Sequence, residues 1–193
     1  MILREYAKME DNSTFTYRIN EININQLEPN GLLNIRCDLG SKDIAIVIKS
    51  VIGLQIPDCR KFLINKDFQI SWMSHDELLV KGAYDDIFSL ETRLDKKLKN
   101  IHSSVVNISD SRTFFDIEGI GVQNVLGKLC PVDLSPSMFK VGDFRRTRMA
   151  QVPVALSFLS LNKFQVMCFT SVKDYVHKLL KISISKGSEV NFY

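Results

Sequence analysis

The side chains best suited to chemistry in this sequence are its three histidines. His75 stands beside Asp76 and Glu77, where it could bind a metal or act as an acid–base group. Either role requires partners that converge on it, and the sequence shows none at ligand spacing. We therefore interpret His75 as a turn residue. His102, near a predicted helix end, and His177, on the polar side of the last predicted helix, are expected to face solvent.

Two pairs of charged residues lie two positions apart on predicted strands. Asp116 and Glu118 would share one strand face, where they could bind a cation or act as an acid. Because no third ligand accompanies them, we expect an exposed strand face. Arg146 and Arg148 also share a face and could grip a carboxylate or phosphate. We treat these two arginines as the candidate contact with a ligand or a partner subunit.

Motifs for covalent catalysis, nucleotide binding and metal binding are absent from the sequence. No serine stands in a G-x-S-x-G setting, and no Walker A motif occurs. Gly119 and Gly121 give only G-x-G after a strand, so Gly119 is interpreted as a strand-to-helix turn. The cysteines form no CxxC pair, and we expect each to behave as a small buried hydrophobe: Cys37, Cys59, Cys130 and Cys168. We predict no catalytic, cofactor-binding or metal-ligating residue.

The composition is that of an ordinary globular protein. Of 193 residues, 45% are hydrophobic and 24% charged. The net charge of +3 is too small to indicate nucleic acid or an anionic membrane as partner. An RNA-associated module that uses Arg145, Arg146 and Arg148 is therefore the weakest hypothesis. With no secretory signal and no apolar run of about 18–20 residues, we expect a cytoplasmic protein.

The pattern of apolar residues predicts an α+β chain built by duplication. Residues 1–30 are polar and irregular and are predicted to form an N-terminal extension or arm, with a strand at 15–19. Residues 31–193 are predicted to form a single domain with halves at about 31–103 and 104–185. Each half reads strand, helix, strands, helix, so that helices cover one side of the sheets.

Helix signals are clear in both halves. Ser41 stands at an N-cap position and Gly53 can end the first helix, although β-branched residues make a strand the competing interpretation. A second helix is predicted over 85–99, with acids first and lysines last. Pro131 ends a third helix, and Ser171 is predicted to cap the fourth. Strands are predicted over 32–39, 67–72, 77–81, 105–108, 114–117, 145–151, 153–159 and 164–170.

Several motifs together resemble a known family. The best matches are the stretch 129–136, Phe139 and the stretch 146–154, and Gly53 begins a segment similar to the family's Gly-Leu-x-Leu-Pro. Residues 72–79 are similar to its Trp-Leu-Gly-Pro-Asp-Glu-Trp-Leu. From about residue 31 onward, the chain thus resembles the gamma subunit of heterotetrameric sarcosine oxidase. It departs from the family where Ser74-His75 replaces Gly-Pro, where Leu78 replaces tryptophan and where Glu118-Gly119-Ile120 replaces Ser-Gly-Pro.

The resemblance implies a fold shared with folate-binding domains of the aminomethyltransferase type. It implies a non-catalytic structural subunit that docks chiefly on an alpha subunit, beside beta and delta subunits. Such a complex oxidatively demethylates sarcosine to glycine, forms hydrogen peroxide and passes a one-carbon unit to tetrahydrofolate. FAD, FMN, NAD, tetrahydrofolate and zinc are then expected on partner subunits and none on this chain. The chain would belong to an oxidoreductase complex without carrying an active site itself.

A second hypothesis keeps the same fold but removes the partners. The chain would then be a free-standing folate-binding protein for one-carbon transfer or iron–sulfur repair. Related repair proteins carry a lysine–glycine–cysteine motif, and aminomethyltransferases carry a Gly-Tyr-Thr-Gly-Glu segment. Neither string occurs in this sequence, which favours the gamma-subunit interpretation.

Overall fold

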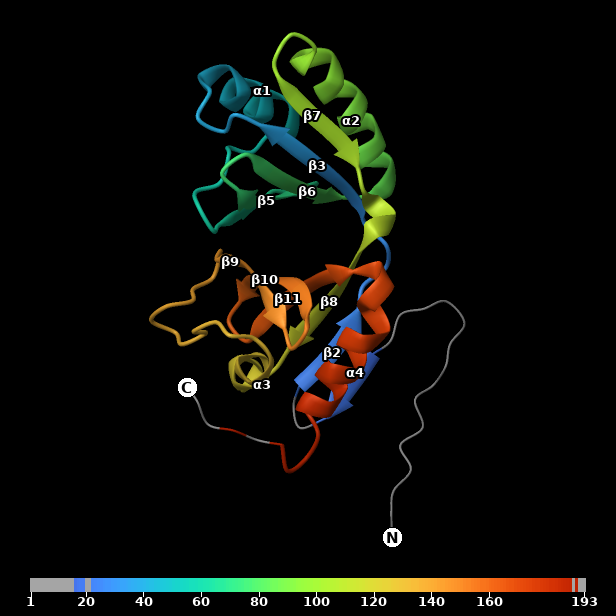
Figure 1. Cartoon of the computed structure of the whole chain (residues 1–193), viewed down its shortest axis with the longest axis vertical. Helices are drawn as coiled ribbons and strands as arrows, with labels where there is room; N and C mark the ends of the chain where they lie inside the picture. Colours follow the sequence, from blue (N-terminus) through green and yellow to red (C-terminus); the bar gives the residue numbers. More distant parts are fainter. Residues whose placement is uncertain (1–15, 20–21, 189, 191–193) are drawn as a thin grey trace.

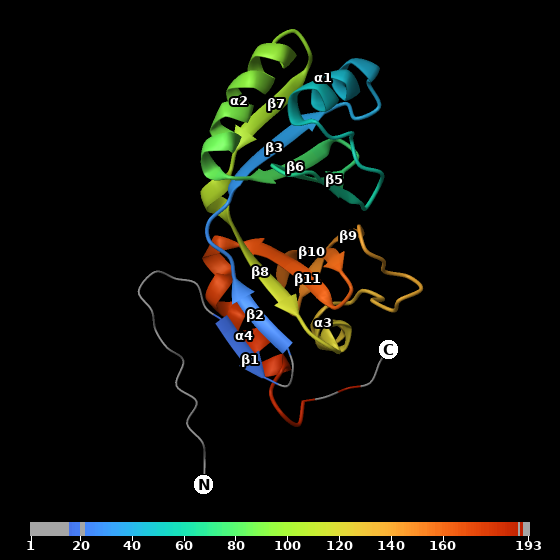
Figure 2. The same ribbon diagram turned by 180° about the vertical axis from the view of Figure 1, so that it is seen from behind.

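The computed structural model describes residues 16–19, 22–188 and 190. These residues form two antiparallel β-sheets, each with a pair of helices (Figure 1). The view from behind shows that the polypeptide passes from one sheet to the other at two neighbouring points, after β2 and after β7 (Figure 2).

The first sheet, sheet B, is built from one continuous stretch of the chain. Its strands lie in the order β4-β5-β6-β3-β7, and α1 and α2 pack on it. The bounds are β3 (Gly31–Cys37), α1 (Lys42–Ile52), β4 (Phe62–Ile64), β5 (Gln69–Ser74), β6 (Glu77–Gly82), α2 (Tyr84–Leu98) and β7 (Ser103–Asn107).

The second sheet, sheet A, combines the start of the described chain with its second half. Its order is β1-β2-β8-β11-β10-β9, and α3 and α4 pack on it. The bounds are β1 (Thr16–Ile19), β2 (Ile22–Gln26), β8 (Arg112–Glu118), α3 (Val122–Leu129), β9 (Phe144–Met149), β10 (Val152–Ser160), β11 (Lys163–Phe169) and α4 (Lys173–Ser183). Two short 3₁₀ helices, η1 (Ser109–Ser111) and η2 (Thr170–Val172), precede β8 and α4.

The two sheets repeat one topology, as the sequence predicted, but they exchange a strand. Strands β4, β5, β6, β3 and β7 of sheet B correspond in order and direction to β9, β10, β11, β8 and β2 of sheet A. The place next to β8 in sheet A is therefore filled by β2 from the N-terminal side, and β1 adds a sixth strand beyond it. The corresponding place in sheet B, next to β3, is filled by β7, although the sequence pattern places that strand in the second half.

The expectation of an N-terminal arm over residues 1–30 is wrong for residues 22–26. Strand β2 pairs with β8, and both Ile22 and Ile24 are buried in the core of sheet A. The first 15 residues of that expected arm lie outside the described residues. That residues 31–193 behave as one domain stays a prediction.

Capping explains where the first helix ends and corrects where the last begins. Gly53 adopts a left-handed conformation, with φ 79°, and its N–H bonds to the carbonyl of Lys49, as predicted for a glycine that ends a helix. Ser41 precedes α1 but makes no side-chain cap. Ser171 does not cap α4, because it lies inside η2 and the helix starts after Val172.

Helices cover one side of each sheet, as predicted, and the other side of each sheet packs against the other sheet. One apolar core lies between sheet B and its helices, and a second lies between sheet A and its helices. A third core joins the two sheets through Leu32, Phe62, Met73, Leu79, Phe114, Phe144, Ala155 and Met167. The sheet faces that carry this third core are called the inner faces below.

The loop between α3 and β9 is fixed from within the core of sheet A. Leu134 and Phe139 are fully buried there. The ring of Phe139 stacks on those of Phe158 and Phe164, with centroids 6.1 and 5.9 Å away. The proline-bounded segment that matches the family best is therefore held in place by its apolar side chains.

Candidate interaction surface between the sheets

The predicted arginine pair lies at the edge of sheet A, on its inner face. Strand β9 is an edge strand. Because side chains alternate along a strand, Arg146 and Arg148 lie on the same side as Phe144, which belongs to the core between the sheets. Both arginines are exposed, so the inner face continues past the apolar core as a charged rim.

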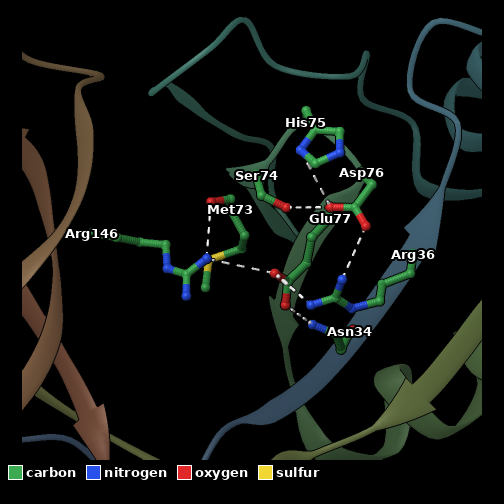
Figure 3. A network of polar contacts seen from close by, with 8 residues as sticks. All are labelled: Asn34, Arg36, Met73, Ser74, His75, Asp76, Glu77 and Arg146. Atoms are coloured by element: carbon green, nitrogen blue, oxygen red, sulfur yellow. Dashed lines mark hydrogen bonds and ion pairs between the residues drawn. The ribbon is translucent and has the colours of Figure 1, made fainter.

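Arg146 reaches across to sheet B. Its Nη1 donates a 3.3 Å hydrogen bond to the carbonyl of Met73 in β5 and lies 3.6 Å from Oε2 of Glu77 in β6 (Figure 3). The Arg146 side chain is 54% exposed to solvent, whereas the Glu77 side chain is 11% exposed. The arginine is therefore accessible to a partner, although it also ties the two sheets together.

Glu77 is the centre of this polar network. Its Oε1 accepts a 2.6 Å hydrogen bond from Asn34, and its Oε2 accepts one of 3.2 Å from Arg36, both from β3 (Figure 3). The carboxylate is thus shared by two arginines from different sheets. Such an arrangement offsets the cost of removing the carboxylate from water.

Asp76 extends the network toward solvent. It accepts hydrogen bonds from Ser74, at 2.5 Å, and from Arg36, at 3.0 Å. The Ser74 hydrogen bond and the charge of Arg36 lower the pKa of Asp76 below its ordinary value. Asp76 therefore stays ionised at neutral pH and orients Arg36.

A partly buried arginine of an inner strand lies beside this network. Arg112 of β8 stacks on the ring of Phe169, with its guanidinium carbon 3.7 Å from the ring centroid. Arg112 and Arg146 line the same cavity of about 60 Å³ between the sheets. Burial lowers the pKa of Arg112, Glu77 raises it, and the charge of Arg146 lowers it further.

The opposite end of the inner face corrects the interpretation of Asp116 and Glu118. Only 14% of the Asp116 side chain is exposed, because it accepts a hydrogen bond from Gln165 and pairs with Lys163 at 3.1 Å. Glu118 is exposed and lies 3.5 Å from the same lysine. Lys81 of β6 completes the cluster by donating to Gln165. These groups connect the sheets.

The histidines take different positions from one another. His75 lies in an exposed turn, as predicted, with Nδ1 3.9 Å from Asp76. His102 is exposed as well. His177 was expected to face solvent, but its ring is partly buried and stacks on Phe115. This burial lowers the pKa of His177. Among the residues that the structure describes, no group of three or more His, Cys, Asp or Glu side chains could hold a metal ion.

Three of the four cysteines are buried, as expected for small apolar side chains. Cys59 is exposed, which corrects the prediction for that residue. Burial raises the pKa of Cys37 to about 11 and those of Cys130 and Cys168 to about 12, so these thiols stay protonated. No helix within residues 16–19, 22–188 and 190 is long and apolar enough to cross a membrane.

Sequence reasoning found Arg146 and Arg148 but missed their neighbours. Arg36 and Arg112 each stand alone in the sequence, and Glu77 was considered only beside His75. These residues come together because side chains along each strand point to alternate faces, and because the inner faces of the two sheets pack against each other. The alternation was visible in the sequence, whereas the pairing of the faces was not.

The sequence matches the family described as "Sarcosine oxidase, gamma subunit family" over residues 36–185. A curated relative, sarcosine oxidase subunit gamma of Corynebacterium sp. (strain U-96), is 32% identical over 112 residues, or 58% of this chain. The chain spans about half the length of that relative, since the alignment covers 54% of it.

Solved structures share the fold. A chain of the heterotetrameric sarcosine oxidase from Corynebacterium sp. U-96 in complex with pyrrole 2-carboxylate superposes with a TM-score of 0.79, at 21% identity, over 89% of this chain and 88% of that one. Glycine cleavage system aminomethyltransferase T from Bartonella henselae gives 0.56 at 11% identity, over 80% and 44%. The predicted α+β fold of the aminomethyltransferase type is confirmed.

Proposed function

Because the chain belongs to the sarcosine oxidase gamma subunit family, we propose that it is a non-catalytic structural subunit of a heterotetrameric, flavin-dependent sarcosine oxidase. The observation that carries this proposal is the family match over residues 36–185, which cover most of the core between the two sheets. The side-chain chemistry supports it. The Glu77 carboxylate is held by Arg36 and Arg146, and the buried thiols stay protonated.

The proposal assigns the chemistry to other subunits. The alpha subunit is the chief neighbour, with beta and delta subunits completing a cytoplasmic complex. FAD, FMN, NAD, tetrahydrofolate and zinc are bound by those partners. The complex converts sarcosine to glycine with oxygen as acceptor, and the one-carbon unit passes to tetrahydrofolate. Arg146 and Arg148 contribute to docking, because their exposed edge strand carries positive charge.

Purification of the tagged chain from its native source tests the proposal. We expect flavin-containing subunits to purify with it in fixed stoichiometry, together with sarcosine-dependent production of hydrogen peroxide. The chain expressed alone should bind neither flavin nor sarcosine. Tight stoichiometric flavin in the isolated chain would contradict the proposal. A micromolar affinity for folate in the isolated chain would favour the free-standing folate-binding alternative instead.

A further inference from the structure

We propose that the cavity between Arg112 and Arg146 receives the carboxylate of an aspartate or glutamate side chain from a partner subunit. The inference rests on the proposed function and names the chemistry of one contact. Arg36, Arg112, Arg146 and Arg148 lie on the rim of the inner faces, with Asp76 and Glu77 as their neighbouring carboxylates. Four positive charges therefore face two negative ones.

The geometry of Arg112 suits it to receive an anion. Its guanidinium is held against the ring of Phe169, and its Nη1 donates to the carbonyl and hydroxyl oxygens of Ser111 at 3.2 and 3.1 Å. Among the described residues, no carboxylate lies within ion-pair distance of Arg112. An oriented arginine without a close counter-charge loses little side-chain entropy when an anion arrives.

Arg146 supplies the second half of the site. Its contacts with Met73 and Glu77 both use Nη1, so the guanidinium is positioned from one side. The charge of Arg146 also acts on Arg112, whose pKa it lowers. An incoming carboxylate would relieve this repulsion by pairing with both arginines.

The size and lining of the cavity decide which anion fits. Its volume of about 60 Å³ is far below the ~300–1,000 Å³ typical of cofactor sites. Ala155 and Met167 form part of its apolar wall. A carboxylate at the end of a short side chain fits this space, and the apolar wall strengthens its ion pairs by excluding water.

Assembly of the complex with variant chains tests the site. We expect Arg112→Gln and Arg146→Gln each to weaken binding of the partner subunits by about tenfold or more. Lys97→Gln on α2 is the control, because Lys97 is exposed and does not line the cavity. It should weaken binding much less. The melting temperature of each isolated variant shows whether the chain still folds. If the wild type assembles and all three variants bind the partner subunits as tightly as the wild type does, the inference is overturned. If the wild type itself does not assemble, the proposed function is contradicted.

A cross-link identifies the occupant even if a glutamine variant folds poorly. Arg112→Lys keeps the charge and introduces a primary amine, and treatment of the assembled complex with a carbodiimide should join that amine to a partner aspartate or glutamate. A cross-link confined to Glu77 of the same chain would contradict the inference. So would saturable binding of acetate by the isolated chain that Arg112→Gln abolishes while assembly is unaffected, because the site would then serve a free carboxylate.

Discussion

Lys81 of β6 donates a 2.7 Å hydrogen bond to Oε1 of Gln165 in β11, so a partly buried lysine joins the two sheets. The same ammonium group lies 4.9 Å from the centroid of the Phe114 ring. Gln165 is 3% exposed, and its Nε2 donates a 2.8 Å hydrogen bond to Oδ1 of Asp116. The inner faces are therefore connected through a partly buried charged group.

The burial of Lys81 predicts a pH dependence of stability. Burial lowers its pKa to about 8, against the partial opposition of Asp116. Between about pH 8 and 10.5 the unfolded chain binds more protons than the folded one, so stability rises with pH. We expect wild type to gain on the order of 1–3 kcal/mol relative to Lys81→Met between pH 7 and 10.

Urea unfolding of both proteins at the two pH values measures this difference. Lys163→Met is the control. Burial lowers the pKa of Lys163, but its bond to Asp116 and the nearby acids raise it more, so the net shift is upward. Its contribution is therefore kept up to pH 10. An equal pH response of wild type and Lys81→Met would show that the lysine is not held in a dry environment.

Gly31 is required by close packing between β3 and α2. A Cβ at this position would lie 2.7 Å from Cγ1 of Ile87 and 2.8 Å from the carbonyl oxygen of Ala83. Since Ile87 is fully buried, we expect Gly31→Ala to cost about 1–3 kcal/mol in urea unfolding. Gly40→Ala should cost much less, because the nearest atom there is a flexible Asp38 oxygen at 3.2 Å. Similar costs for the two variants would refute this packing argument.

Phe139 anchors the loop that precedes β9. Its ring is fully buried and stacks on two other rings. We expect Phe139→Ala to lower the free energy of unfolding by about 3–5 kcal/mol. The neighbouring Met138 is 62% exposed, so Met138→Ala should change stability by less than about 0.5 kcal/mol. A small loss for Phe139→Ala would mean that the loop is held by other contacts.

Charge reversal at the arginine pair tests the proposed docking face. We expect the double variant Arg146→Glu, Arg148→Glu to weaken assembly with the partner subunits, measured by co-purification and by oxidase activity. Because Arg146→Glu also places a carboxylate near Glu77, Arg148→Glu alone separates docking from folding. The exposed pair Lys96 and Lys97 on α2, reversed in the same way, is the control. Unchanged assembly and activity would retire this role for the arginines.

Local patterns predicted most elements, because helical spacing and strand alternation are read along the chain. Strand β2 was missed although Ile22 and Ile24 alternate with Asn23 and Asn25, since an arm had been expected there. Asp116 shows what a local pattern leaves open. Because Asp116 and Glu118 lie two positions apart, the sequence predicts that they share a strand face. Only the contacts in the folded chain show that this face is covered at Asp116.

The candidate surface was predictable only in part for the same reason. Arg146 and Arg148 could be recognised as a pair within one strand. The contact between Arg112 and Phe169 depends on the pairing of β8 with β11, and the contact between Arg146 and Glu77 depends on the approach of two sheets. No local sequence pattern predicts either contact.

The strand exchange has a consequence for the order of folding. Sheet B draws all its strands from residues 31–107, so it can pair as soon as that stretch has left the ribosome. Strand β2 is made earlier but must wait for β8, since Gln26 pairs with Phe115. Long-range pairing is slow. We therefore expect sheet B to form first, and the apolar side chains of β2 to be exposed to aggregation until the second half is synthesised.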